Sequence, residues 1–103
     1  MDVPDRRKFE RYTVPTTLEI EDLGYRQRVG TSDISASGCQ VRLRRRLASA
    51  ATVEVKIEVQ GAGEARGRAT VAWEDLSDPH HVGLVFAPAL AEAMLPILRK
   101  LVM

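Results

Sequence analysis

Val53-Glu54-Val55-Lys56-Ile57-Glu58-Val59 is the stretch that decides the fold class, because its apolar and charged side chains alternate without a break. Side chains point to opposite faces along a β-strand, so this period of two predicts a strand with one buried face. Gln60-Gly61-Ala62-Gly63 follows with the residue types of a tight turn, and residues 65–73 are predicted to return as a second strand. One face of this second strand is expected to hold Ala69, Val71 and Trp73. A β-hairpin is therefore predicted here.

The same alternation recurs on either side of this hairpin. The further strands are predicted at residues 12–20, 25–34, 39–43 and 80–86. Pro15 lies inside the first of them and indicates a sheet edge or a bulge, because proline has no N–H for a ladder. Short strands joined by turns are typical of an antiparallel sheet that closes around an inward face of Val, Ile and Leu. We therefore predict an all-β fold, a six-stranded antiparallel β-barrel with a C-terminal α-helix.

The expected helix covers residues 88–103, and Pro88 suits its first turn, where an N–H would have no partner inside the helix. Apolar side chains recur along it at three- and four-residue spacing, which predicts one buried stripe. The stripe consists of Leu90, Met94, Ile97, Leu98 and Leu101. Pro96 is expected to kink or split the helix. The helix is expected to cap one end of the barrel, and the alternative is that it docks a partner or a second copy.

Length and charge limit the function classes. The chain has 103 residues, enough for one domain with one modest core, and its net charge is +1. Proteins that coat long nucleic acids carry a strong basic excess, so no nucleic-acid polymer is expected as a partner. The arginines nevertheless cluster at 6–11 and 42–46. Such local basic patches suit a small anion better than a polymer.

The N-terminal region and the single cysteine indicate the cellular setting. Cys39 has no partner for an internal disulfide and is compatible with a reducing compartment. The N-terminus lacks the apolar segment of a secretory signal, and no run approaches the roughly 20 apolar residues that span a bilayer. We expect a cytoplasmic protein. Residues 1–11 bury too little to hold themselves in place, so a flexible arginine-rich arm is expected before a folded domain at 12–103.

A short polar stretch carries the clearest chemistry. Asp33-Ile34-Ser35-Ala36-Ser37-Gly38 places a carboxylate, two hydroxyls and a flexible backbone position within six residues. The preceding arm supplies three guanidinium groups, those of Arg6, Arg7 and Arg11. Arginine binds phosphate through two parallel hydrogen bonds, and a carboxylate accepts from the N–H edge of a purine. A site containing both halves fits an anionic ligand with purine edges, which describes a nucleotide.

These two motifs, RxxxR at Arg7–Arg11 and DxSxxG at Asp33–Gly38, resemble the signatures of a PilZ domain, in the same order and at a fitting separation. The resemblance covers nearly the whole chain, because the strand pattern and the terminal helix match as well. It implies a bacterial receptor for the second messenger cyclic di-GMP, without catalytic activity and with no cofactor besides that ligand.

The resemblance also assigns roles to individual residues. It implies that Arg7 and Arg11 bind phosphate or the O6/N7 edge of guanine, and that Asp33 accepts from the guanine N1–H and exocyclic amine. Ser35 would donate to a phosphate or a base edge, and Gly38 would allow close approach. Each has a local alternative: Asp33 can cap a turn, and Ser35 can be a strand-end hydroxyl. Gly38 is expected to adopt a backbone conformation unfavourable to other residues.

Two further residues complete the expected ligand-binding set. Arg6 immediately precedes RxxxR, and in the family an arginine there is similar to forms that bind two stacked ligand molecules. Trp73 either stacks on guanine, as an aromatic residue does in some family members, or packs in the core. The predicted ligand-binding residues are Arg6, Arg7, Arg11, Asp33, Ser35, Gly38 and Trp73.

Other chemistries fit the sequence less well. His80 and His81 are adjacent, so on a strand they face opposite ways and cannot share a metal without other ligands. Cys39 has no neighbouring base. No enzyme and no metal site are therefore expected. The predicted function is a receptor that orders its N-terminal arm on ligand and shows a changed surface to an unidentified protein effector. The alternatives are a protein–protein interaction module that acts without nucleotide and a small-barrel nucleic-acid binder.

Overall fold

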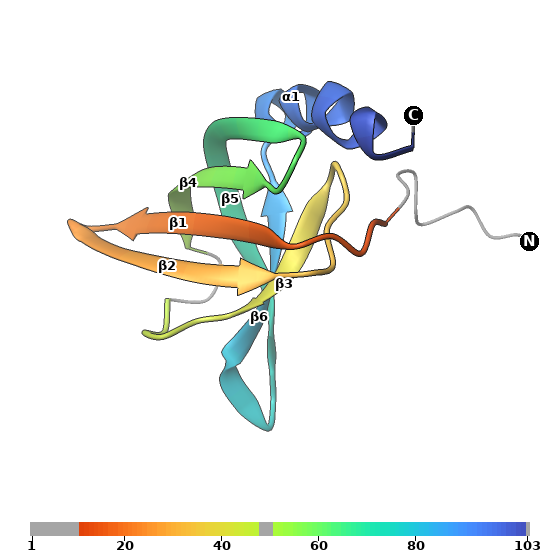
Figure 1. The fold of residues 1–103 in the computed structure, drawn as a ribbon. Coiled ribbons are helices and arrows are strands. Elements are labelled where there is room, and N and C mark those ends of the chain that lie inside the picture. Colours follow the sequence, from red (N-terminus) through yellow and green to blue (C-terminus); the bar gives the residue numbers. More distant parts are fainter. Residues whose placement is uncertain (1–10, 48–50, 103) are drawn as a thin grey trace, which may run out of the picture.

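The computed structural model describes residues 11–47 and 51–102, which form one antiparallel sheet in the strand order β2-β1-β4-β5-β6-β3, followed by one helix (Figure 1). The elements are β1 (Thr16–Asp22), β2 (Tyr25–Thr31), β3 (Gly38–Arg42), β4 (Thr52–Val59), β5 (Gly63–Asp75), β6 (Asp78–Phe86), α1 (Pro88–Arg99) and the 3₁₀ turn η1 (Lys100–Val102). The predicted class, six antiparallel strands with a C-terminal helix, is confirmed.

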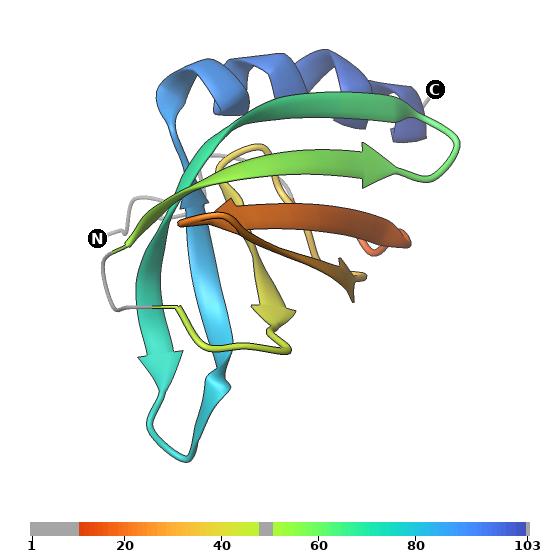
Figure 2. The ribbon, with the colours of Figure 1, turned by 90° about the vertical axis from the view of Figure 1, so that its left-hand side faces the viewer.

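The sheet curls into a half-barrel whose two edge strands are β2 and β3 (Figure 2). No ladder joins these two edges within 11–47 and 51–102. The opening between them is bridged instead by the buried side chain of Gln27 in β2. Its Nε2 donates to the carbonyl of Arg45 at 2.9 Å, and its Oε1 accepts from the Arg44 N–H at 2.8 Å. These hydrogen bonds join β2 to the segment that follows β3, and we call this opening the β2–β3 seam.

Alternating side chains of the strands fill the inside of the curl. The fully buried ones include Leu18, Ile20, Val53, Ile57, Val59 and Val82. The helix α1 lies along β5 at one end of the sheet (Figure 2) and buries Leu90, Met94, Ile97 and Leu98. The predicted cap on one end of the barrel is therefore what the structure shows. Within the described residues, no helix is long and apolar enough to cross a membrane.

Two prolines act differently from the sequence prediction. Pro96 was expected to kink or split the helix, but α1 continues through it from Pro88 to Arg99, so the split is wrong. Pro96 is exposed, and its ring faces solvent while the buried stripe stays intact. Pro15 does not lie in a strand, because β1 begins only at Thr16. Before it, Tyr12 forms an isolated bridge with Ile34.

Trp73 is where the predicted alternation fails. The β5–β6 register passes from Val71 opposite Leu84 to Trp73 opposite Gly83, which leaves Ala72 as an extra residue in a β-bulge. A bulge shifts every later side chain to the other face. Val71 is accordingly buried, whereas Trp73 is 43% exposed. The prediction that these two share one face is wrong for this reason.

Candidate functional site

The Tyr12–Ile34 bridge brings the two predicted motifs together. The Tyr12 N–H donates to the Ile34 carbonyl at 2.7 Å, and the Ile34 N–H donates back at 3.0 Å. Ile34 is fully buried. Since neighbouring residues of a strand point to the opposite side, Arg11 and Asp33 both face solvent on the far side of this bridge.

Arg11 and Asp33 form a two-fold hydrogen-bonded ion pair. The Nε of Arg11 donates to Oδ1 of Asp33 at 2.9 Å, and its Nη2 donates to Oδ2 at 2.6 Å. The two side chains are 39% and 42% exposed. The hydrogen bonds that Arg11 donates to Asp33 raise the pKa of Arg11 above its ordinary value, so the guanidinium stays charged. A cation and a carboxylate 22 residues apart are thus held face to face at the surface.

Ser35 follows two residues after Asp33 and is almost fully buried. Its N–H donates to the Gly38 carbonyl at 2.9 Å, and its Oγ accepts from the Ser37 N–H at 3.2 Å. The two hydroxyl groups also lie 3.1 Å apart. Ser35 therefore shapes the turn before β3, in line with its local alternative, while Ser37 carries the exposed hydroxyl. The sequence analysis did not single out Ser37, although the motif spacing contained it.

Gly38 is required for a different reason from the one predicted. Among the glycines, positive φ angles occur at Gly24, Gly61 and Gly63, and Gly38 is not one of them. A Cβ on Gly38 would instead lie 2.1 Å from the carbonyl oxygen of Leu84 in β6. The expectation of an unusual backbone conformation is wrong, because the missing side chain makes room for the neighbouring strand.

Trp73 lies on the outer face of the same part of the sheet. Its strand partner Gly83 pairs in turn with Gln40 of β3, two residues beyond Gly38. That register places Trp73 roughly 7 Å along the strands and about 10 Å across them from Gly38. The core-packing alternative for Trp73 is wrong, because the residue is 43% exposed.

Two of the predicted arginines lie outside the described residues, and within those residues neither Cys39 nor a metal centre offers a catalytic group. Arg6 and Arg7 lie outside the described residues. Burial raises the pKa of the Cys39 thiol to about 12, and the nearby Asp33 carboxylate adds to this, so the thiol is protonated and no nucleophile. Within the described part of the chain, no group of three or more His, Cys, Asp or Glu side chains is arranged to hold a metal ion.

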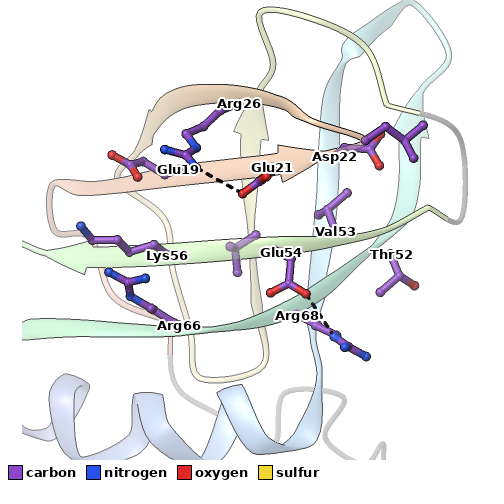
Figure 3. A pocket seen from close by; sticks show the side chains of 12 residues that line it. Glu19, Glu21, Asp22, Arg26, Thr52, Val53, Glu54, Lys56, Arg66 and Arg68 are labelled. Atoms are coloured by element: carbon purple, nitrogen blue, oxygen red, sulfur yellow. Dashed lines mark hydrogen bonds and ion pairs between the residues drawn. The ribbon is translucent and has the colours of Figure 1, made fainter.

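A separate hollow of about 850 Å³ lies on the outer face of β1, β4 and β5 (Figure 3). Charged side chains from neighbouring strands line it, and several pair with one another. Arg26 contacts Glu21, and Arg68 contacts Glu54, each at 3.4 Å. None of the described motif residues lines this hollow. The surface around Arg11 and Asp33 is the candidate site because the two sequence motifs meet there.

The comparison with protein families identifies the class of this domain. The model of the PilZ domain family matches residues 5–103, which is nearly the whole chain. The chain therefore belongs to the PilZ domain family, and the resemblance seen in the sequence is confirmed. A comparison with curated protein sequences finds no match.

Solved structures with the same fold include three that are informative. Escherichia coli YcgR in complex with c-di-GMP has a TM-score of 0.71 and 15% identity, over 94% of this chain and 46% of that one. The PilZ domain of YcgR with c-di-GMP has a TM-score of 0.68 and 13% identity, over 93% and 91%. The Bacillus subtilis inhibitor of motility, MotI/DgrA, has a TM-score of 0.68 and 19% identity, over 95% and 52%. At such identities the likeness establishes the fold.

Proposed function

We propose that this chain is a receptor module for cyclic di-GMP and not an enzyme. The observation that carries the proposal is the solvent-facing Arg11–Asp33 pair, which joins the two PilZ motifs across 22 residues. Family membership and the names of the similar structures, two of which contain c-di-GMP, support the same ligand.

The chemistry of the pair suits the two ends of that ligand. The two oxygens of Asp33 can accept from the N1–H and the exocyclic amine of guanine, a pair of donors that adenine lacks. The guanidinium of Arg11 can bind a phosphate through two parallel hydrogen bonds. Both side chains are exposed, so their mutual ion pair contributes only about 0–1 kcal/mol. The ligand can therefore replace it at little cost.

Further contacts in the proposal come from the rest of the predicted set. Arg6 and Arg7 would add phosphate contacts, and Arg6 would offset the charge of a second, stacked ligand molecule. Trp73 offers a partly exposed flat ring on the outer face, whereas Gly38 is buried and would act by letting β6 pack close to β3. Ser37, rather than the buried Ser35, carries the hydroxyl available to the ligand.

The signalling mechanism we propose is that bound ligand fixes the N-terminal segment against the half-barrel. The arginines of residues 6–11 would close over the phosphates from one side while Asp33 holds a guanine from the other. The surface changed in this way would be recognised by a protein effector.

Isothermal titration calorimetry with cyclic di-GMP tests the proposal and gives affinity and stoichiometry together. Arg11→Ala and Asp33→Ala should each weaken binding at least tenfold or so, because each removes a charge-assisted hydrogen-bonding group. Glu54→Ala and Arg68→Ala remove a comparable exposed ion pair from the hollow in Figure 3 and are the matched controls, expected to bind like wild type. Unchanged affinity in both site variants would contradict the proposal.

A further inference from the structure

The indole of Trp73 rests directly on the backbone of Gly83. A Cβ built on Gly83 would lie 2.2 Å from Nε1 and 2.3 Å from Cε2 of Trp73. Any larger residue at this position would push the ring away. One face of the indole is thus pressed against β6, and the side chain still leaves 43% of its surface open to solvent.

His81 fixes the edge of the same ring. Its imidazole meets the indole of Trp73 edge-on, with centroids 5.3 Å apart and an interplanar angle of 86°. The imidazole is itself held between two side chains from the neighbouring strands. Its Nδ1 lies 3.3 Å from Oδ2 of Asp75 in β5, and its Nε2 lies 3.1 Å from Oε1 of Gln40 in β3.

Asp75, which contacts His81, is itself held in place by Ser77. Its Oδ1 accepts from both the N–H and the hydroxyl of Ser77, each at 2.9 Å. The contacts therefore run from the β5–β6 turn through Asp75, His81 and Gln40 and tie together three strands. Nothing in the core requires this arrangement, because His81 and Trp73 both lie on the outer face.

We propose that Gly83 and His81 are positioning residues that hold Trp73, the residue already expected to stack on guanine, as a rigid platform. The proposal rests on the cyclic di-GMP site proposed above and adds residues that neither motif contains. A ring that is already fixed loses little side-chain freedom when a base stacks on it, so positioning improves affinity without a direct contact from His81.

Trp73 is the only tryptophan of the chain, so its fluorescence reports on the platform alone. In the ligand-free protein, His81→Ala should lower the anisotropy of Trp73 and raise its quenching by acrylamide. His80→Ala is the matched control, since the neighbouring histidine makes no contact with Trp73 among those described. Equal fluorescence behaviour of the two variants would overturn the positioning role.

Titration with cyclic di-GMP then separates positioning from direct contact. Trp73→Ala should weaken binding roughly tenfold or more, the usual effect of losing one base–aromatic stack. His81→Ala should weaken it by a smaller factor, and the double variant should bind no worse than Trp73→Ala alone, because His81 acts only through the indole. Additive losses in the double variant would overturn the proposal. If wild-type protein binds no cyclic di-GMP, the proposed function fails, and the ligand-free fluorescence still decides whether His81 positions Trp73.

Discussion

At the scale of single residues, Gly38 and Gly83 show what a missing side chain can do in a sheet. In both, another group occupies the space that a Cβ would need: the Leu84 carbonyl at Gly38 and the Trp73 indole at Gly83. One glycine lets two strands approach, and the other lets a ring lie on a strand.

Replacing Gly38 by alanine should therefore destabilise the fold. The new Cβ would lie 2.1 Å from a backbone oxygen, which cannot rotate away. Overpacking of this kind costs about 1–3 kcal/mol, and each kcal/mol lowers the melting temperature of a domain this size by roughly 4–8 °C. Thermal unfolding followed by circular dichroism measures the effect. Gly30→Ala is the control, because its nearest neighbour is at an ordinary 3.7 Å, and an equal loss in both variants would contradict this account.

The positions of site residues were predictable from the sequence only where the two motifs fix them. The facing of Arg11 and Asp33 followed from the two motifs together. The burial of Ser35 did not, because it depends on the turn folding over its hydroxyl. Nor did the exposure of Trp73, because a bulge at Ala72 leaves no mark in the alternation of apolar residues.

At the scale of elements, the β5–β6 hairpin stands out because it extends past the rest of the sheet, away from α1 (Figure 1). Asp75 caps its turn through Ser77 and contacts His81. The Ser77 backbone N–H, the Ser77 hydroxyl and His81 together lower the pKa of Asp75. The charged carboxylate is therefore the form that stabilises this turn.

That lowered pKa gives Asp75→Asn a characteristic dependence on pH. A folded-state pKa below the unfolded value adds stability that is fully present above about pH 4 and is lost as the pH falls through the folded pKa. Asp75→Asn should thus melt below wild type at pH 7, and the two melting temperatures should converge under acid. Melting curves at a series of pH values measure this. A gap that stays constant down to about pH 3 would mean that the charge of Asp75 is not involved.

The elements themselves were largely predictable, because six alternating stretches give a clear period-two signal. Their ends were not. Pro15 separates Tyr12 from β1, and β2 ends at Thr31, although Ile34 still pairs with Tyr12 beyond it. The helix was predicted with a break at Pro96, but a proline on the exposed side removes one hydrogen bond without disturbing the buried stripe.

At the scale of the whole molecule, the strand order could not be read from the chain. Consecutive strands β2 and β3 lie at opposite edges of the sheet, and the seam between them is bridged by Gln27. Antiparallel strands with similar apolar faces can pair in several orders. In the sequence, a buried polar side chain of a strand cannot be distinguished from one that faces solvent. Gln27 was such a case, since it is 4% exposed.

Gln27→Leu should weaken the whole domain through this seam. It would leave the N–H groups of Arg44 and Arg45 and the Arg45 carbonyl without their present partner. An unsatisfied buried group costs about 1–3 kcal/mol. Urea unfolding gives the loss of stability, and hydrogen exchange should show faster exchange at Arg44 and Arg45. Arg26→Gln, at an exposed site on the same strand, should stay within about 0.5 kcal/mol of wild type. Equal stability of the two variants would contradict a structural role for the seam.

The seam has a consequence for the candidate site, because residues 32–37 are the stretch of chain that runs from one margin of the sheet to the other. Asp33, Ser35 and Ser37 all belong to this strap. A ligand bound to this strap would hold the two edge strands together, so ligand binding and the stability of the half-barrel would be thermodynamically linked. A substitution that weakens the contacts across the open side of the half-barrel would then also lower the affinity for the ligand.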